Sequence, residues 1–192
     1  KSWLTIAIVF IIIILAIIFC LFQMMVLAIA IDVGVIGEDW DYKVSANNTW
    51  ANIGNPANAT GTITSIQIFL ASPSTGDLTV ATFFRVDENH FTARDSVNLG
   101  AVSAGSNLTF TKDKNNNDIA LDIESGDIIG YFSATGSAEC DVTGGDDLVY
   151  GSGDCTESTN FMVWTNADDR MGLYGTGATG EAKDNALFWF NF

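Results

Sequence analysis

The sequence predicts an α+β protein in which one long hydrophobic α-helix precedes an all-β sandwich or jelly-roll domain. Residues 2–31 contain no charged residue, no glycine and no proline, whereas all 23 acidic residues lie after residue 31. The later part is rich in Gly, Thr, Ser and Asn and has short β-branched and aromatic runs, which is typical of strands joined by turns. We therefore expect a hydrophobic helix at 1–36 and a β-sandwich domain at 37–192.

The apolar segment is longer than a membrane requires. A helix of this length spans about 45 Å at 1.5 Å per residue, whereas the hydrocarbon core of a bilayer is about 30 Å thick. Its few polar side chains are Ser2, Thr5 and Gln23, so we expect the helix to be buried on all sides. It is also longer than the apolar region of a signal peptide, so we expect it to be retained.

After the apolar segment, Gly34 and Gly37 are expected to end the helix and form a flexible neck. Alternation of Ile119, Leu121 and Ile123 with polar or small residues predicts a half-buried strand. The C-terminal ALFWFNF is expected to dock as a strand. We expect strands near residues 41–45, 60–71, 78–86, 92–99, 108–111, 119–123, 128–134, 148–150, 161–165, 170–174 and 186–192.

The charge distribution restricts the partners and the location. The formal net charge is −15, which repels phosphate backbones, so we expect no nucleic-acid partner. The positive-inside rule leaves Lys1 in the cytoplasm and predicts an extracellular β domain.

Two of the three cysteines lie in one acidic, glycine-rich stretch. Outside the cell, Cys140 and Cys155 are expected to form a disulfide. Closing a loop of this size would contribute roughly 3 kcal/mol; the alternative is two free thiols. Cys20 is expected to act as a small apolar residue.

One loop resembles a calcium-binding sequence. Asp113, Asn115, Asn117 and Glu124 provide oxygen atoms at positions 1, 3, 5 and 12 of such a loop, although Asp118 occupies the position of the usual glycine. Calcium is thus the candidate cofactor, and an asparagine-rich turn is the alternative. A second acidic cluster raises the same two possibilities: Asp141, Asp146, Asp147 and Asp154.

The inventory of catalytic residues is small. His90 is the single histidine, and no nucleophile is marked beside it, so we assign no catalytic residue and expect no enzyme activity. Residues 175–180 match G-x-G-x-x-G, but the following residues are too few for a dinucleotide-binding unit, and we expect a strand connection. Glycosylation motifs occur at Asn47, Asn58 and Asn107.

The layout of the chain resembles the type IV filament subunits, above all the archaeal pilins and archaellins. The resemblance is carried by a start at Lys1 that fits processing of a precursor, an unbroken apolar run of about 30 residues and a glycine-containing neck before one β domain. Thr5 stands where the bacterial members have glutamate, which favours the archaeal branch. GTITSIQIF, ESGDIIGYF and GLYGTGATG are similar to small jelly-roll domains of secreted and phage-associated proteins.

The filament resemblance implies a homo-polymer for adhesion or surface attachment, with the helices in its core and a precursor stored in the cytoplasmic membrane. Two alternatives stay open: a motility filament of the archaellum type, and a single-span membrane protein whose jelly roll binds glycans or another partner. Residues at helical spacing would line the filament core: Leu4, Ile8, Ile11, Leu15, Ile18, Phe22, Met25 and Ile29.

Overall fold

The computed structural model describes residues 3, 7–15, 28–143, 148–166 and 169–179. The chain divides into two units, one made of Lys1–Ala28 and Glu181–Phe192 and the other of Ile29–Gly180. Within the first unit, the described residues form a helix over 7–15. Among the described residues, no helix has the length and apolar character needed to cross a bilayer.

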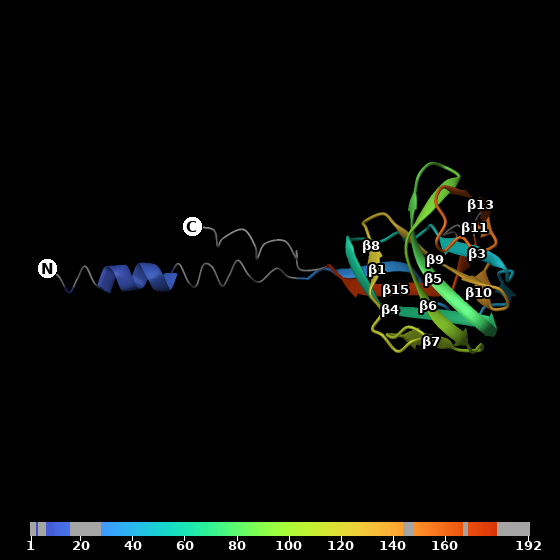
Figure 1. Cartoon of the computed structure of the whole chain (residues 1–192), viewed down its shortest axis with the longest axis horizontal. Helices are drawn as coiled ribbons and strands as arrows, with labels where there is room; N and C mark the ends of the chain where they lie inside the picture. The colour runs from blue at the N-terminus through green and yellow to red at the C-terminus, as the bar shows by residue number, and fades with distance from the viewer. Residues whose placement is uncertain (1–2, 4–6, 16–27, 144–147, 167–168, 180–192) are drawn as a thin grey trace. The chain divides into compact units, whose positions relative to one another are not determined.

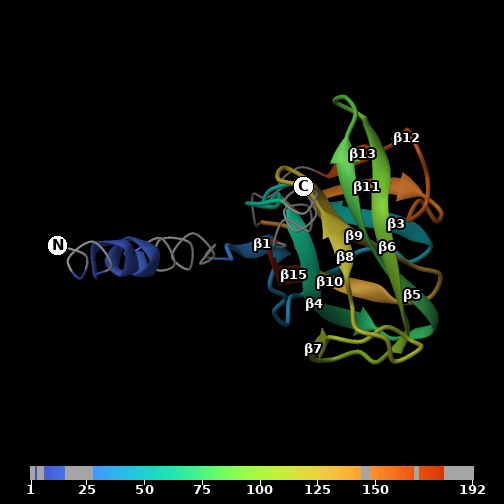
Figure 2. The ribbon, with the colours of Figure 1, turned by 60° about the vertical axis from the view of Figure 1, so that its left-hand side comes forward.

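The second unit is built from two β-sheets that curl into a near-barrel (Figures 1 and 2). The eight-stranded sheet has the central order β1-β15-β4-β10-β14, with β2 on β10 and with β7 and β8 on β4. Its strands are β1 (Ala30–Val35), β2 (Tyr42–Lys43), β4 (Gly61–Ser72), β7 (Asn107–Phe110), β8 (Leu121–Ile123), β10 (Ser137–Asp141), β14 (Arg170–Met171) and β15 (Leu173–Ala178).

The seven-stranded sheet has the order β12-β6-β5-β9-β3-β11-β13. Its longest pair is the β5–β6 hairpin, whose turn projects beyond the other strands in both views (Figures 1 and 2). Its strands are β3 (Asn48–Asn52), β5 (Ser74–Arg85), β6 (His90–Val102), β9 (Ile128–Ser133), β11 (Leu148–Ser152), β12 (Phe161–Met162) and β13 (Trp164–Asn166).

Two hydrophobic clusters hold this unit together. The main cluster draws on both sheets and includes the fully buried Ile68, Leu70 and Tyr131. Ala51 and Val149 belong to the second cluster. Because successive side chains of a strand point to opposite faces, the second cluster lies on the other face of the seven-stranded sheet. All members of both clusters lie between residues 31 and 173, so the core of this unit is self-contained.

The prediction of a long N-terminal helix is wrong. The described helix covers only 7–15, and Ala30–Val35, which we expected to close the helix and begin a neck, forms β1 of the large sheet. Ile31 and Val33 are buried whereas Ala30 is exposed. This alternation belongs to a strand, but it is masked in the sequence because β1 directly follows an apolar run. The unit that contains both sheets begins at Ile29.

The expectation of a transmembrane helix is wrong for the same reason, because the helix among the described residues is too short to cross a bilayer. The expected β-sandwich is confirmed. Most expected strands are present with shifted ends, but β1, β3 and β10 were not expected. The expected docked strand at 186–192 lies outside the described residues.

β1 is fixed on both sides rather than forming a flexible neck. One edge pairs with β15 in antiparallel register from Ala30↔Ala178 to Val35↔Leu173. Along the other edge, Asn58 accepts a hydrogen bond from the Asp32 N–H (3.0 Å) and donates one to the Ala30 carbonyl (3.1 Å). Asn55 donates to the Gly34 carbonyl (2.8 Å) and to the Asp32 carboxylate (2.9 Å). These two amides replace a neighbouring strand and so protect an edge that could otherwise pair with another chain.

The G-x-G-x-x-G sequence at 175–180 is explained by close packing of strands. Residues Leu173–Ala178 form β15, which lies between β1 and β4. A Cβ atom at Gly177 would lie 1.9 Å from the Thr62 carbonyl oxygen and 2.8 Å from the Ile63 Cα atom. Glycine is therefore required here by the approach of the β4 backbone.

Candidate functional site

A polar cleft of about 690 Å³ lies beside the β5–β6 hairpin. Its walls come from the two hairpin strands, from β9 and from two loops, 111–118 and 153–160. Its lining residues are Asp77, Thr79, Ser96, Val97, Asn98, Asp113, Asn115, Phe132, Asp154, Thr156, Glu157 and Ser158. Carboxylate, amide and hydroxyl groups predominate, so the cleft offers many hydrogen-bonding groups and little apolar surface.

The hairpin wall is tied to the first loop by Lys114. Its ammonium group donates to the Asp77 carboxylate (2.8 Å), and its backbone N–H donates to the Asn98 carbonyl (2.9 Å). Hydrogen bonds from Lys114 and Asn98 lower the pKa of Asp77 below its usual range. The cleft therefore contains at least one carboxylate that is already paired with a cation.

The expected calcium loop forms a compact turn. One Asp113 carboxylate oxygen accepts the backbone N–H groups of Asn115 and Asn117, both at 2.8 Å, and the other accepts the Asn117 side-chain amide at 3.0 Å. The hydrogen bonds from Asn117 and Asn115 lower the pKa of Asp113. Asn116 adopts a positive φ of 66°, which asparagine tolerates in turns. The structure thus brings Asp113, Asn115 and Asn117 together through the turn itself.

Glu124, the fourth expected ligand, lies apart from this loop. Its carboxylate accepts a hydrogen bond from Arg94 (2.8 Å), whereas the 113–117 loop contacts Asn98, four residues further along β6. Four strand residues span roughly 13 Å. Glu124 and the turn at Asp113 therefore contact different parts of β6.

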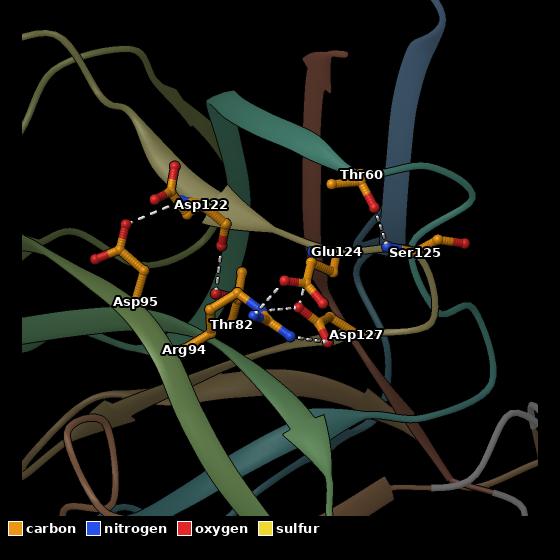
Figure 3. Close-up of polar contacts among 8 residues, drawn as sticks. All are labelled: Thr60, Thr82, Arg94, Asp95, Asp122, Glu124, Ser125 and Asp127. Atoms are coloured by element: carbon orange, nitrogen blue, oxygen red, sulfur yellow. Dashed lines mark hydrogen bonds and ion pairs between the residues drawn. The ribbon is translucent and has the colours of Figure 1, made fainter. Parts of the chain in front are cut away.

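Figure 3 shows the cluster around Arg94, which points toward Glu124 and Asp127. The guanidinium group makes a two-pronged contact with the buried Asp127 carboxylate, which also accepts the Glu124 backbone N–H at 2.8 Å. The hydrogen bond to Asp127 raises the pKa of Arg94. The Arg94 guanidinium also lies over the Phe84 ring, 5.1 Å from its centre. These contacts fasten the β5–β6 hairpin to the turn between β8 and β9.

A second pair of contacts in the same view joins the two sheets (Figure 3). Asp95 of β6 accepts the backbone N–H of Asp122 in β8 (2.9 Å), and the Thr82 hydroxyl of β5 donates to the Asp122 carbonyl (2.7 Å). Because these donors and acceptors satisfy one another, the Arg94 cluster is best explained as a structural connection.

The predicted disulfide is absent from the structure, because Cys140 and Cys155 are both free, buried thiols. Cys140 belongs to the main core. Cys155 lies next to Gly151 of β11 and Phe161, on the other face of the seven-stranded sheet. A disulfide requires Cα atoms within about 7 Å, so a sheet between the two thiols prevents pairing. Burial raises the pKa of the Cys140 thiol to about 11 and also raises that of Cys155.

Two residues of the second acidic cluster are described, and they have different hydrogen-bond partners. Asp141 accepts hydrogen bonds from Arg170 at 3.0 and 3.2 Å, whereas Asp154 closes its own turn through the Thr156 backbone N–H and hydroxyl. Asp146 and Asp147 lie outside the described residues. Within the described ranges, no group of three or more His, Cys, Asp and Glu side chains is arranged to hold a metal ion. Calcium binding stays a prediction, which a calcium titration followed by thermal unfolding would test.

The asparagine side chains of the three glycosylation motifs differ in their hydrogen bonds. Asn58 caps β1, and the Asn107 amide donates to the Gly37 carbonyl at 3.0 Å. Asn47 is exposed at a positive φ of 62°, and its side chain makes no hydrogen bond within the described part of the chain. Asn47 therefore offers the most accessible acceptor nitrogen of the three.

The expected filament-core residues are described only in part. Ile8, Ile11, Leu15 and Ile29 are between 49% and 59% exposed. The remaining four, Leu4, Ile18, Phe22 and Met25, lie outside the described residues. Nothing in the described structure covers the helix at 7–15.

A row of aromatic side chains crosses the seven-stranded sheet and was not predicted. Trp50 of β3 and Trp164 of β13 lie on either side of Tyr150 of β11, with ring centres 4.8 and 5.5 Å from that of Tyr150. The three residues face each other directly in the strand register. Trp50 is buried and Trp164 is half exposed, so the row leads from the core to the sheet edge. Only the pairing of the strands could reveal it.

His90 is placed in the hairpin turn region, as the sequence suggested, and its ring nitrogen Nδ1 lies 2.8 Å from the Asp87 carboxylate. Hydrogen bonds from Asn89 and His90 lower the pKa of Asp87. No described serine, threonine or cysteine side chain has a hydrogen bond to His90. The pair therefore lacks the nucleophile that acyl-transfer chemistry requires.

Comparison with known proteins gives no assignment: no family model, no curated protein and no solved structure matches this chain. The resemblance to type IV filament subunits therefore depends on the sequence layout alone.

Proposed function

We propose that this chain is a structural subunit of an extracellular homo-polymer, which assembles through its apolar N-terminal segment and displays the β unit. One observation carries the proposal: the helix at 7–15 consists entirely of apolar residues, and its large side chains are between 46% and 66% exposed. Exposed apolar surface of this extent marks an interaction site.

Neighbouring copies of the same chain can bury the exposed apolar side chains of this helix. Each copy presents apolar side chains around the whole circumference, so one neighbour cannot bury them all. When the contact between neighbouring copies joins two different surfaces and does not close into a ring, it produces an open helical polymer. Each Å² of apolar surface removed from water contributes about 25 cal/mol before the costs of association.

Features of the β unit support assembly through the N-terminal segment rather than through the sheets. Asn55 and Asn58 cap the outer edge of β1, which lowers the tendency of this edge to add a strand from another copy. The net charge of −15 also opposes close contact between displayed β units. Adhesion or surface attachment is the role that the filament resemblance implies.

Negative-stain microscopy and sedimentation velocity of the full chain test this proposal. We expect the wild-type chain to form extended assemblies and Leu15→Asp to remain dispersed, because a charge in the contact surface would be buried without a partner. Ser103→Asp, on an exposed turn of the β unit, serves as the control and should still assemble. Assemblies that persist unchanged in Leu15→Asp would contradict the proposal.

A second candidate function is recognition of a polyhydroxylated ligand, such as a glycan, in the polar cleft. The volume of about 690 Å³ favours it, because small-molecule sites span roughly 300 to 1,000 Å³. Titration with a panel of neutral oligosaccharides, followed by NMR, would test it. We expect shifts at Ser96 and Asn98 that weaken in Glu157→Gln and persist in Glu88→Gln, which changes an exposed carboxylate outside the cleft. No shift with any sugar would reject this candidate.

A further inference from the structure

The two ends of the β unit meet at one point. The Ile29 N–H donates to the Thr179 hydroxyl, and the Thr179 N–H donates to the Ile29 carbonyl, both at 3.0 Å. These contacts continue the β1–β15 ladder by one step beyond the Ala30↔Ala178 pair. The chain therefore enters the β unit at Ile29 beside Thr179, the last described residue, and residues 1–28 and 181–192 belong to one unit of the chain.

The C-terminal residues are chemically suited to cover an apolar surface. Their last seven residues, ALFWFNF, contain three phenylalanines, one tryptophan and one leucine. Aromatic side chains bury large areas and contribute strongly at interfaces. The described structure provides an uncovered apolar surface of matching character, the helix at 7–15.

The length of this segment also fits. Thirteen residues follow Thr179, and thirteen separate Leu15 from Ile29. An extended chain of thirteen residues reaches on the order of 45 Å. The aromatic residues can therefore reach the neighbourhood of residue 15 from the shared starting point at Ile29 and Thr179.

We propose that the C-terminal segment, residues 180–192, docks on the apolar helix at 7–15 of the same chain. Its aromatic side chains cover part of the helix surface. The inference goes beyond the proposed assembly and does not require it, because the docking partner is within one molecule. In an assembly, the surface presented to neighbouring copies would consist of both ends of the chain.

Cysteine cross-linking of the full chain tests this docking. Cys20→Ser removes the native thiol of the N-terminal segment, and the other two native thiols are 3% and 6% exposed. In this background, Leu15→Cys is combined with Phe190→Cys. The matched control combines Leu15→Cys with Gly76→Cys, where a Cβ atom meets open space. Both double variants are treated with the same short bis-maleimide, and cross-linked peptides are identified by mass spectrometry.

We expect an intrachain cross-link that forms about tenfold faster in the Phe190→Cys pair than in the control, because docking raises the local concentration of the two thiols. Equal rates, or cross-links between chains only, would overturn the inference. Sedimentation of the same samples reports the assembly separately: an intrachain cross-link in a monomeric chain would support docking while contradicting the proposed polymer. Thermal unfolding verifies that the β unit is intact in both variants.

Discussion

The helix at 7–15 and the strands of the β unit use the same apolar side chains in opposite ways. Leu15 is 59% exposed in the helix, whereas Leu70 in β4 is 0% exposed. In the β unit, alternation along the strands directs most apolar side chains into one of the two hydrophobic clusters, and Leu70 belongs to the main one. In the helix, apolar residues occupy every position, so no fold of nine residues can bury them. Apolar composition alone therefore does not produce a core, because the side chains also need a neighbouring surface that buries them.

The largest expected effect comes from placing the same charge in both regions. Leu70→Asp buries a carboxylate without a partner and should cost at least about 5 kcal/mol, enough to unfold a typical domain. Leu15→Asp should leave the melting temperature of the β unit unchanged. Thermal unfolding followed by circular dichroism at the strand signal measures both. A large loss of β-unit stability in Leu15→Asp would mean that the two regions are not energetically separate.

The next-largest loss of stability is expected for a substitution at Gly34, which tests whether β1 contributes to the folding of the β unit. Gly34 has a φ of +80°, and a Cβ atom there would lie 2.3 Å from the Leu173 carbonyl oxygen. Strain and displacement of β15 should cost about 4 kcal/mol in Gly34→Ala. Gly76→Ala, which meets open space, should change stability by less than about 0.5 kcal/mol. Urea unfolding measures both variants, and equal midpoints would show that β1 contributes little.

An intermediate loss of stability is expected when the connection between the β5–β6 hairpin and the turn between β8 and β9 is removed. Arg94→Met removes the partner of Asp127, whose side chain is only 4% exposed, and should cost about 3 kcal/mol. Lys112→Met removes an ion pair in which both side chains are largely exposed, and should cost less than about 0.5 kcal/mol. Urea midpoints again provide the measurement. Similar losses in both variants would contradict the structural role assigned to the Arg94 cluster.

The smallest predicted effect is a pH dependence at β1. The Tyr174 hydroxyl donates to the Asp32 carboxylate at 2.7 Å, and burial together with Asp32 raises the pKa of Tyr174 from 10.0 to about 12. The folded chain holds this proton more tightly than the unfolded chain does. The stabilisation is therefore fully present below pH 10 and is lost as the pH rises from 10 to 12.

Tyr174→Phe should accordingly be about 1 kcal/mol less stable than wild type at pH 8, and the difference should vanish near pH 12. Urea unfolding at a series of pH values measures the convergence. Tyr42→Phe, which changes an exposed tyrosine, should follow the wild-type pH profile. A Tyr174→Phe deficit that stays constant with pH would show that its hydroxyl proton does not contribute.

Sequence patterns predicted the strands whose burial alternates locally. Ile119, Leu121 and Ile123 are buried, as their spacing indicated, whereas Asp122 between them is exposed. β3, with the sequence NTWAN, lacks such a signal because its position depends on pairing with β9 and β11 on both sides. The sequence did not reveal the start of β1, because residues 24–29 directly before it are all apolar and so do not mark a change from helical to strand periodicity.

The candidate sites differ in the same way. Contacts between residues close in the sequence were predictable, whereas contacts between distant residues were not. The turn at Asp113 was visible because all of its partners lie within four residues. The Arg94–Asp127 contact joins residues 33 positions apart, and the polar cleft combines two loops with three strands, so no local pattern marks either. The spacing of Cys140 and Cys155 carried no information about the sheet that separates them.

Sedimentation velocity of the isolated β unit, residues 29–180, beside the full chain tests whether the β unit folds by itself and whether assembly depends on the apolar N-terminal segment. We predict a monomeric fragment with the melting temperature of the β unit in the full chain, and a full chain that sediments as large assemblies. A fragment that assembles, or a full chain that sediments as a monomer, would contradict the account.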